Sequence, residues 1–468
     1  MKLRVENLAR IKEAEVEVKN LTLFVGQNST HKSYMAHVIY ELYKEVANLK
    51  NNYGITSRFA IIISKKVQQN YQREIEYLLS LKKELTEEIE SHQIDIDEWQ
   101  DEQYTNLKIF IDDKDEKLLT FFNQIYNLLF VELTKKINNS FNINKEILKK
   151  LYVENPRILS SKEYISVTFL TPLEHFEEDD EEVKYRVVNS IVRDLIDSLQ
   201  NQLNNYYSSY YFPASRTGFV LTLDEIYAGI FRDKFRGQVS ATRLGEPTID
   251  FIQTFADIKT GKINESISYP TLFSHDYNYV SIENNKLVSF LEQNIIKGKI
   301  KEVRNDQDYA SYYLDVGGVE LDLHLASSAT LETLPFIVFL KNTQDISKTF
   351  FIIEEPEAHL HPKAQIQMAK FIVMLSNAGA KVLVTTHSDY ILNEINNCIK
   401  LYSLDQKNEF AISNNDISAY LFKNEENETT VNILNIDKFG IANDNFDEVL
   451  DELLDKSNKL SEKILEND

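Results

Sequence analysis

Two short, continuous runs of apolar residues near the end of the chain constrain its fold more than any other feature. They are TFFIIEEP at 349–356 and KVLVTTHS at 381–388, and helical patterns follow them near 363–377 and 389–396. Strands that are apolar throughout are buried on both faces, which is typical of parallel sheets covered by helices on both sides. The sequence therefore predicts an α/β fold with a mixed, largely parallel central sheet.

A third apolar run, Leu21–Val25, leads into a polar turn and then into a helical pattern. Residues 26–33, GQNSTHKS, fit the phosphate-loop pattern G-x-x-x-x-G-K-[ST], except that His31 replaces the second glycine. Such a loop points backbone N–H groups at phosphate oxygens and is backed by a helix N-terminus. We expect Lys32 to neutralise the β- and γ-phosphates of ATP and the Ser33 hydroxyl to ligate Mg²⁺. The residues predicted to bind ATP are Gly26, Asn28, Ser29, Thr30, His31, Lys32, Ser33 and Tyr34.

An ordinary strand–turn–helix is the alternative interpretation of this loop. A side chain at His31 must tolerate a backbone that glycine adopts freely, although His is enriched at unusual φ. Hydrolysis is expected to be slow, and a nucleotide-binding scaffold with little or no hydrolysis stays open as a function.

Two adjacent carboxylates end the strand TFFIIEEP. Ligands of open α/β sheets bind beside the carboxyl ends of the strands. Glu354 is expected to ligate Mg²⁺, directly or through water, and Glu355 to polarise an attacking water. The next strand ends at His387, whose imidazole is predicted to donate to the γ-phosphate. An exposed acidic turn and a structural histidine are the alternatives.

Two further segments leave a structural and a functional interpretation open. In LASSA at 325–329, Ser327 and Ser328 are either ordinary helix caps or part of a γ-phosphate site at a helix N-terminus. Arg216, in PASRTG after an aromatic strand, either contacts phosphate or base or bridges a carboxylate in the core.

The order of these motifs resembles the ABC-type ATPase heads of SMC-like DNA-repair proteins and, more closely, the overcoming-lysogenization-defect (OLD) class of bacterial ATPases. FIIEEPEAHLHP, VTTHS and LASSATLETLP look like the Walker B motif with D-loop, the switch histidine and the signature segment of that class. The resemblance covers about 1–50 and 305–400. It implies an ABC-type head with an inserted helical domain, and Mg²⁺-dependent hydrolysis of ATP to ADP and phosphate.

The same resemblance implies roles for particular residues. Glu355 and His387 correspond to the catalytic glutamate and the γ-phosphate sensor, and Ser327 and Ser328 to a signature that acts across a dimer. His361 stands where ABC proteins usually carry the D-loop aspartate, which puts communication between two sites in doubt.

OLD-type proteins often carry a C-terminal TOPRIM nuclease, which needs roughly 100 residues or more. Only residues 401–468 follow the last motif, so we expect no nuclease here. The chain then resembles the stand-alone ATPase subunits of bacterial antiphage systems of the Septu or PARIS kind. That resemblance implies a head-to-head dimer or higher homo-oligomer, a separately encoded effector (a nuclease or toxin), and a phage protein as trigger.

Four parts are expected along the chain. They are an N-terminal lobe of the head at 1–55, a helical insertion at 56–205, a C-terminal lobe at 206–400 and a small α/β tail at 401–468. Tyr71, Leu78 and Leu85 share a heptad position over barely three heptads, which favours a short hairpin or bundle as an interaction arm. The acidic run Glu177–Glu182 predicts a solvated loop.

Charge and cysteine content narrow the partners and the compartment. The formal net charge of −22 repels phosphate, so DNA is not the favoured partner. The lysines of KGKIK at 297–301 nevertheless keep a DNA-engaging, SMC-like repair ATPase as an alternative. The single cysteine, Cys398, fits a reducing cytosol, and no apolar run approaches the roughly 20 residues needed to span a bilayer. We expect a cytoplasmic protein without a membrane partner.

Overall fold

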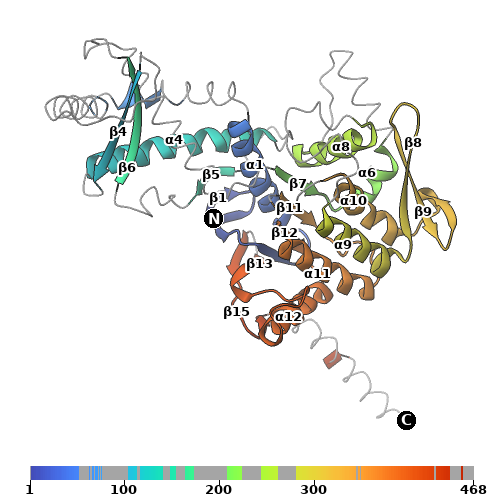
Figure 1. Ribbon diagram of the computed structural model, residues 1–468. Helices are drawn as coiled ribbons and strands as arrows, with labels where there is room; N and C mark the ends of the chain where they lie inside the picture. The colour runs from blue at the N-terminus through green and yellow to red at the C-terminus, as the bar shows by residue number, and fades with distance from the viewer. Residues whose placement is uncertain are drawn as a thin grey trace. The chain divides into compact units, whose positions relative to one another are not determined.

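The structure is a computed structural model, and its contacts divide the chain into two compact units (Figure 1). Unit 1 comprises Met1–Glu6 and Glu41–Tyr207, and unit 2 comprises Asn7–Tyr40 and Ser208–Asp468. The residues that the structure describes are 2–51, isolated positions between 63 and 75, 104–112, 116–140, 148–153, 164–172, 208–223, 244–261, 281–343, 346–347, 349–425, 428–442 and 455–456.

Unit 2 is built on a mixed, largely parallel sheet, which confirms the α/β class. In sheet order its strands are β2 (Ile11–Glu17), β14 (Glu428–Ile433), β13 (Ile417–Glu425), β3 (Leu21–Gly26), β12 (Lys381–Thr386), β11 (Thr349–Glu354) and β7 (Ser208–Phe212). Every neighbouring pair is parallel except β13 and β14, which are antiparallel. All residues of β3, β12 and β11 are buried, as continuous apolar runs require.

Helices flank this sheet. Those of unit 2 are α6 (Arg216–Leu221), α8 (Glu246–Lys259), α9 (Ile282–Leu291), the π-helical η1 (Glu292–Ile296), α10 (Ser328–Asn342), α11 (Pro362–Asn377) and α12 (Asp389–Leu404); α1 (Lys32–Asn51) begins in unit 2 and continues into unit 1. The helical patterns predicted near 363–377 and 389–396 correspond to α11 and α12, which pack against each other (Figure 1). Aromatic side chains join α10 to the sheet: the Phe212 and Phe336 rings stack with centroids 4.6 Å apart.

A second, antiparallel sheet in unit 2 contains β8 (Lys299–Arg304), β9 (Ala310–Val316) and β10 (Val319–Asp322). Strands β9 and β10 form a hairpin across Gly317 and Gly318, whose φ values of 63° and 88° require glycine-like freedom. Three short elements complete the described part of unit 2. They are η2 (Leu323–Leu325), η3 (Asn414–Asp416) and the strand pair β15 (Ile436–Asp437) and β16 (Gly440–Ile441).

The described part of unit 1 combines one long helix with strands. Its elements are β1 (Lys2–Leu8), β4 (Tyr104–Asp112), α4 (Glu116–Ser140), β5 (Leu148–Val153) and β6 (Tyr164–Pro172). Strands β4 and β6 pair antiparallel along their whole length. The heptad positions Leu78 and Leu85 and the acidic run Glu177–Glu182 lie outside the described residues. The limits and the helical character of the insertion stay predictions.

Strand β13 was not expected in the central sheet, because residues 401–468 were assigned to a tail. It lies next to β3, with Ile417 opposite Leu21 and Phe422 opposite Gly26. Residues 443–468 of the expected tail lie outside the described residues, apart from Asp455 and Lys456. Among the described helices, none combines the length and the hydropathy needed to cross a membrane.

Candidate functional site

Strands β3, β12 and β11 end at the same edge of the sheet. Thr385 lies opposite both Glu354 and Phe24, and Thr386 lies opposite Val25. The phosphate-loop candidate follows β3, His387 follows β12 and Glu355 follows β11. The register therefore brings three of the predicted motifs to one site, as the parallel order of the strands requires.

The loop after β3 is shaped by a close approach of two strands. Gly26 has φ 143°, and a Cβ there would overlap the carbonyl oxygen of Phe422 on β13. Ser29 and His31 follow with φ values of 61° and 64° in the left-handed region. The Thr30 hydroxyl donates to the Gln27 carbonyl (2.8 Å). The loop is thus a tight, glycine-dependent turn that ends at the first residue of α1.

Lys32 fills the centre of this loop. Its side chain is buried, and Nζ donates to the carbonyls of Gly26 (2.8 Å) and Gln27 (2.7 Å) and to Thr30 Oγ1 (3.2 Å). Burial lowers the pKa of Lys32, while Glu355, followed by Glu357 and Glu354, raises it. An ammonium held by loop carbonyls at a helix N-terminus fits an anionic ligand such as a phosphate chain.

His31 adopts the backbone that the phosphate-loop pattern reserves for glycine. Its φ of 64° is one that His tolerates better than most residues, and its Nδ1 lies 3.0 Å from Thr429 Oγ1 on β14. Asn424 on β13 donates to the Ser29 carbonyl (3.3 Å). Strands β13 and β14 therefore hold the loop from outside. Burial, and then the positive charge of Arg10, lower the pKa of His31.

The two carboxylates after β11 differ in their surroundings. Glu354 is buried: its Oε2 accepts a bond from the Ala214 N–H (3.4 Å), and its Oε1 has no hydrogen-bond partner among the described residues. A buried carboxylate oxygen without a donor fits a cation such as Mg²⁺. Glu355 is partly exposed and has φ 42°, and its N–H donates to the Thr385 carbonyl (2.9 Å).

Glu357 is a site residue that the sequence interpretation missed. This buried carboxylate accepts bonds at Oε1 from the Thr386 hydroxyl (2.7 Å) and the His387 N–H (2.8 Å), and the same oxygen lies 3.3 Å from His387 Nδ1. It therefore fixes both the end of β12 and the His387 ring. The available signal was the second acid of the EPE sequence, two residues after Glu355.

Arg216 pairs with a carboxylate in the core, which is one of the two roles that the sequence left open for it. The side chain is fully buried and forms an ion pair with Glu332 (Nη2 to Oε2, 2.8 Å), which is also fully buried. Its Nη1 donates to the Glu354 carbonyl (2.8 Å) and its Nη2 to the Glu355 carbonyl (3.3 Å). Arg216 therefore bridges a core carboxylate and the turn after β11, which is the second of its two predicted roles.

The remaining candidates lie at helix starts on the surface. Ser327 and Ser328 are exposed, and Ser327 Oγ accepts a bond from the Thr330 N–H at the start of α10 (3.3 Å). His361 is exposed and caps α11, with its Nδ1 accepting from the Lys363 N–H (3.3 Å). In the described part of the chain these three residues form no hydrogen bond with the phosphate-loop candidate.

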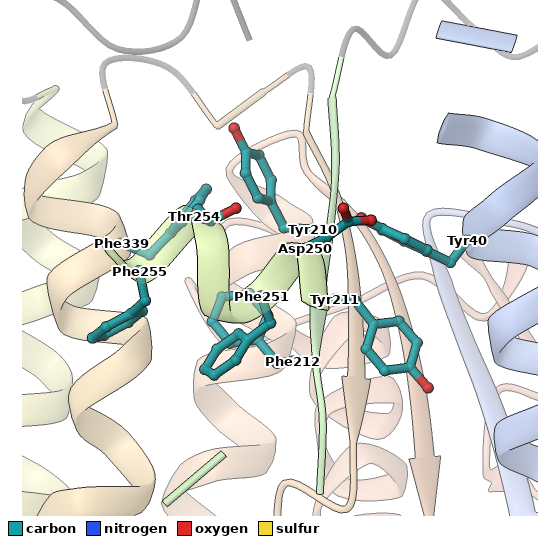
Figure 2. A pocket seen from close by; sticks show the side chains of 9 residues that line it. All are labelled: Tyr40, Tyr210, Tyr211, Phe212, Asp250, Phe251, Thr254, Phe255 and Phe339. Atoms are coloured by element: carbon teal, nitrogen blue, oxygen red, sulfur yellow. The ribbon is translucent and has the colours of Figure 1, made fainter. Parts of the chain in front are cut away.

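A small aromatic cavity lies beside the sheet and joins α1 to α8 (Figure 2). The Tyr40 hydroxyl donates to Asp250 Oδ2 (2.9 Å), and the Tyr40 and Tyr211 rings meet with centroids 5.4 Å apart. The cavity volume is about 10 Å³, which is room for one water molecule. A cavity of this size holds no nucleotide base. The contacts around it connect α1, the helix that starts at the phosphate-loop candidate, to α8 and β7.

Comparison with known proteins gives one family and a set of distant folds. A family model described as AAA ATPase domain matches residues 1–392. No curated protein matches the chain. An SMC head bound to the C-winged helix domain of ScpA is 12% identical, with 93% of this chain and 98% of that chain covered and a TM-score of 0.35. An SMC head domain from Thermotoga maritima is 9% identical, with coverage of 93% and 98% and a TM-score of 0.33. Neither likeness shows a shared function.

The lowered pKa of His31 predicts a pH effect on stability. As the pH falls, His31 takes up a proton in the unfolded chain near its ordinary pKa of about 6.5, and in the folded chain only at lower pH. Protonation therefore favours the unfolded chain. The stability that neutral His31 contributes is present above pH 6.5 and is lost as the pH falls below it. His31→Asn tolerates left-handed φ but does not titrate. We expect urea unfolding to show that wild type loses more stability than His31→Asn between pH 8 and pH 5. Equal losses in the two proteins would contradict this.

Proposed function

The chain belongs to the AAA ATPase domain family, and we propose that unit 2 binds ATP with Mg²⁺ and hydrolyses it where β3, β12 and β11 end. The observation that carries this proposal is the buried ammonium of Lys32, held inside the loop after β3. Near it lie the carboxylates of Glu354 and Glu355, whose charges act on its pKa. A cation for the phosphates, a carboxylate for the metal ion and a carboxylate that orients the attacking water are recurring protein groups in phosphoryl transfer.

Each residue at the site has a distinct proposed role. Lys32 exchanges its carbonyl partners for the β- and γ-phosphates, and the N–H groups of the loop bind the same oxygens. Ser33 and Glu354 hold Mg²⁺, which supplies positive charge against the phosphates when bound. Glu355 polarises the attacking water. His387, whose ring is oriented at Nδ1 by Glu357, faces the γ-phosphate.

Two matched variants separate binding from hydrolysis. Lys32→Ala is expected to weaken ATP binding by at least about 100-fold, because the phosphates lose their main counter-charge. Glu355→Gln is expected to keep ATP affinity within about 3-fold and lower kcat by at least about 100-fold. Calorimetry measures the first effect and phosphate release the second.

The two variants have different contradicting outcomes. Wild-type affinity in Lys32→Ala would refute the phosphate-loop assignment. Unchanged turnover in Glu355→Gln would assign water activation to another group, with Glu354 the first to examine. A wild type that binds ATP without turnover would favour the alternative of a nucleotide-binding scaffold.

We further propose that two copies close ATP sites between them, with Ser327 and Ser328 of one copy acting on the nucleotide of the other. The exposure of both serines at the start of α10 supports this, since a helix N-terminus binds anions. His361, at the position of the D-loop, would lie at the same contact.

Dimer formation is expected to depend on ATP and on the serine segment. Glu355→Gln protein with ATP and Mg²⁺ should sediment as a dimer, because uncleaved nucleotide holds the two heads together. Ser328→Arg in the same background should remove that dimer, because a bulky cation replaces a small hydroxyl at the contact. Analytical ultracentrifugation with and without ATP is the measurement. A dimer that persists in Ser328→Arg protein would leave the two serines as helix caps.

We propose, on the sequence resemblance, that this ATPase is the sensor or scaffold subunit of a bacterial antiphage system and controls a separately encoded effector. Two of the three lysines of the KGKIK segment have an acid beside them, which favours this role over a DNA-engaging one. Lys301 pairs with Glu320, and Lys299 lies opposite Asp315.

Phage challenge tests this role directly. Cells that express the chain together with its neighbouring gene are expected to resist phage, and Lys32→Ala should remove the resistance because the effector is then no longer controlled by ATP. Plating efficiency of a phage panel is the measurement. Sensitivity of the wild-type strain to every phage, or resistance that survives Lys32→Ala, would contradict the proposal.

A further inference from the structure

Glu332 and Arg216 form an ion pair in the interior of unit 2, and neither side chain is accessible to solvent. Glu332 lies on α10, five residues after Ser327, and Arg216 is the first residue of α6. Two charges taken out of water are costly unless each finds further hydrogen-bond partners.

The guanidinium of Arg216 donates four hydrogen bonds to backbone carbonyls and forms an ion pair with the Glu332 carboxylate. Nε donates to the Glu332 carbonyl (3.2 Å) and Nη1 to the carbonyls of Pro213 (3.2 Å) and Glu354 (2.8 Å). Nη2 is directed at the Glu355 carbonyl (3.3 Å) and the Glu332 carboxylate (2.8 Å). The guanidinium thus joins α10 to the two residues proposed to hold Mg²⁺ and activate water.

The other oxygen of Glu332 completes the network. Oε1 accepts bonds from the Thr217 hydroxyl (2.5 Å) and from His359 Nδ1 (2.8 Å). His359 belongs to the turn between β11 and α11, has φ 54°, and its side chain is 66% exposed. The buried carboxylate of Glu332 therefore links its own helix, α10, to the start of α6 and to the turn that begins at Glu355.

The turn after β11 depends on these bonds. Glu355 and His359 both have left-handed φ values, which cost non-glycine residues on the order of 1 kcal/mol each and persist only where the surroundings hold them. Glu355 receives such support from Arg216 through its carbonyl, and His359 from Glu332 through its ring. The hydrogen bonds of Lys32 Nζ, by contrast, all go to residues of its own loop.

We propose that Glu332 is a positioning residue that couples α10 to the Glu354–Glu355 turn, so that a contact made by the exposed start of α10 changes hydrolysis rather than ATP binding. This rests on the proposed ATPase function. A second copy that binds at Ser327 and Ser328 would shift the first turns of α10. Glu332 and Arg216 would pass that shift to the carbonyls of the turn and so to the Glu355 carboxylate.

The test is Glu332→Gln in the full chain, which keeps the shape of the side chain and removes its charge. We expect kcat to fall by at least about 10-fold and the Kd of ATP to stay within about 2-fold. Glu292→Gln is the matched control: Glu292 is also buried and forms an ion pair with Lys341 near the other end of α10 (3.1 Å). Its kcat should stay within about 2-fold of wild type, since the network at the start of α10 is intact.

His359→Gln provides a second variant that an exposed position tolerates. We expect a smaller loss of kcat, about 3-fold, and a double variant with Glu332→Gln that is no slower than Glu332→Gln alone, because both changes act on one network. If Glu332→Gln fails to fold, the kcat of the His359→Gln variant tests the proposal by itself.

Three results would overturn the inference. They are wild-type kcat in the Glu332→Gln and His359→Gln variants, a loss of ATP affinity that matches the loss of kcat, and an equal loss of kcat in Glu292→Gln. In each of these cases wild type still turns over ATP, so the proposed function stands. A wild type that neither binds nor hydrolyses ATP overturns both.

Discussion

A buried guanidinium holds the turn on which the whole site depends. Arg216 is surrounded by carbonyls of Pro213, Glu354 and Glu355 and by the carboxylate of Glu332. Removing one partner of a buried ion pair typically costs 3–5 kcal/mol, because the remaining charge is left uncompensated. The two acids at the end of β11 are therefore placed by the interior of unit 2 and not by their own loop. A buried arginine thereby holds the backbone of the turn that carries Glu354 and Glu355.

The loop after β3 is held by a different constraint, which is close approach between strands. Only glycine fits at position 26 beside the Phe422 carbonyl, and Asn424 and Thr429 fix Ser29 and His31 from the same pair of strands. The loop keeps left-handed backbone at two non-glycine residues, so the cost of that conformation is met by contacts from β13 and β14. The loop and the acidic turn thus meet at one edge with separate supports.

Much of this arrangement could be predicted from local pattern. Continuous apolar strands and helical patterns predicted β3, β11, β12, α11 and α12, and polar residues at strand ends gave the loop, Glu355 and His387 as candidates. What sequence could not supply depends on distant pairing. The place of β13 beside β3 joins residues about 400 positions apart, and the bonds of Arg216 to Glu332 and of Glu357 to His387 require the folded sheet. A lone arginine or a second acid in a turn has too many local explanations to decide among them.

We propose that ATP binds inside the loop after β3 while the Arg216 network keeps the acidic turn in place. A crystal structure of Glu355→Gln protein with ATP and Mg²⁺ tests this most directly. It should show Lys32 Nζ on phosphate oxygens instead of the carbonyls of Gly26 and Gln27, with the Arg216 bonds to Glu354 and Glu355 retained. Nucleotide bound elsewhere, with Lys32 still on those two carbonyls, would contradict the account.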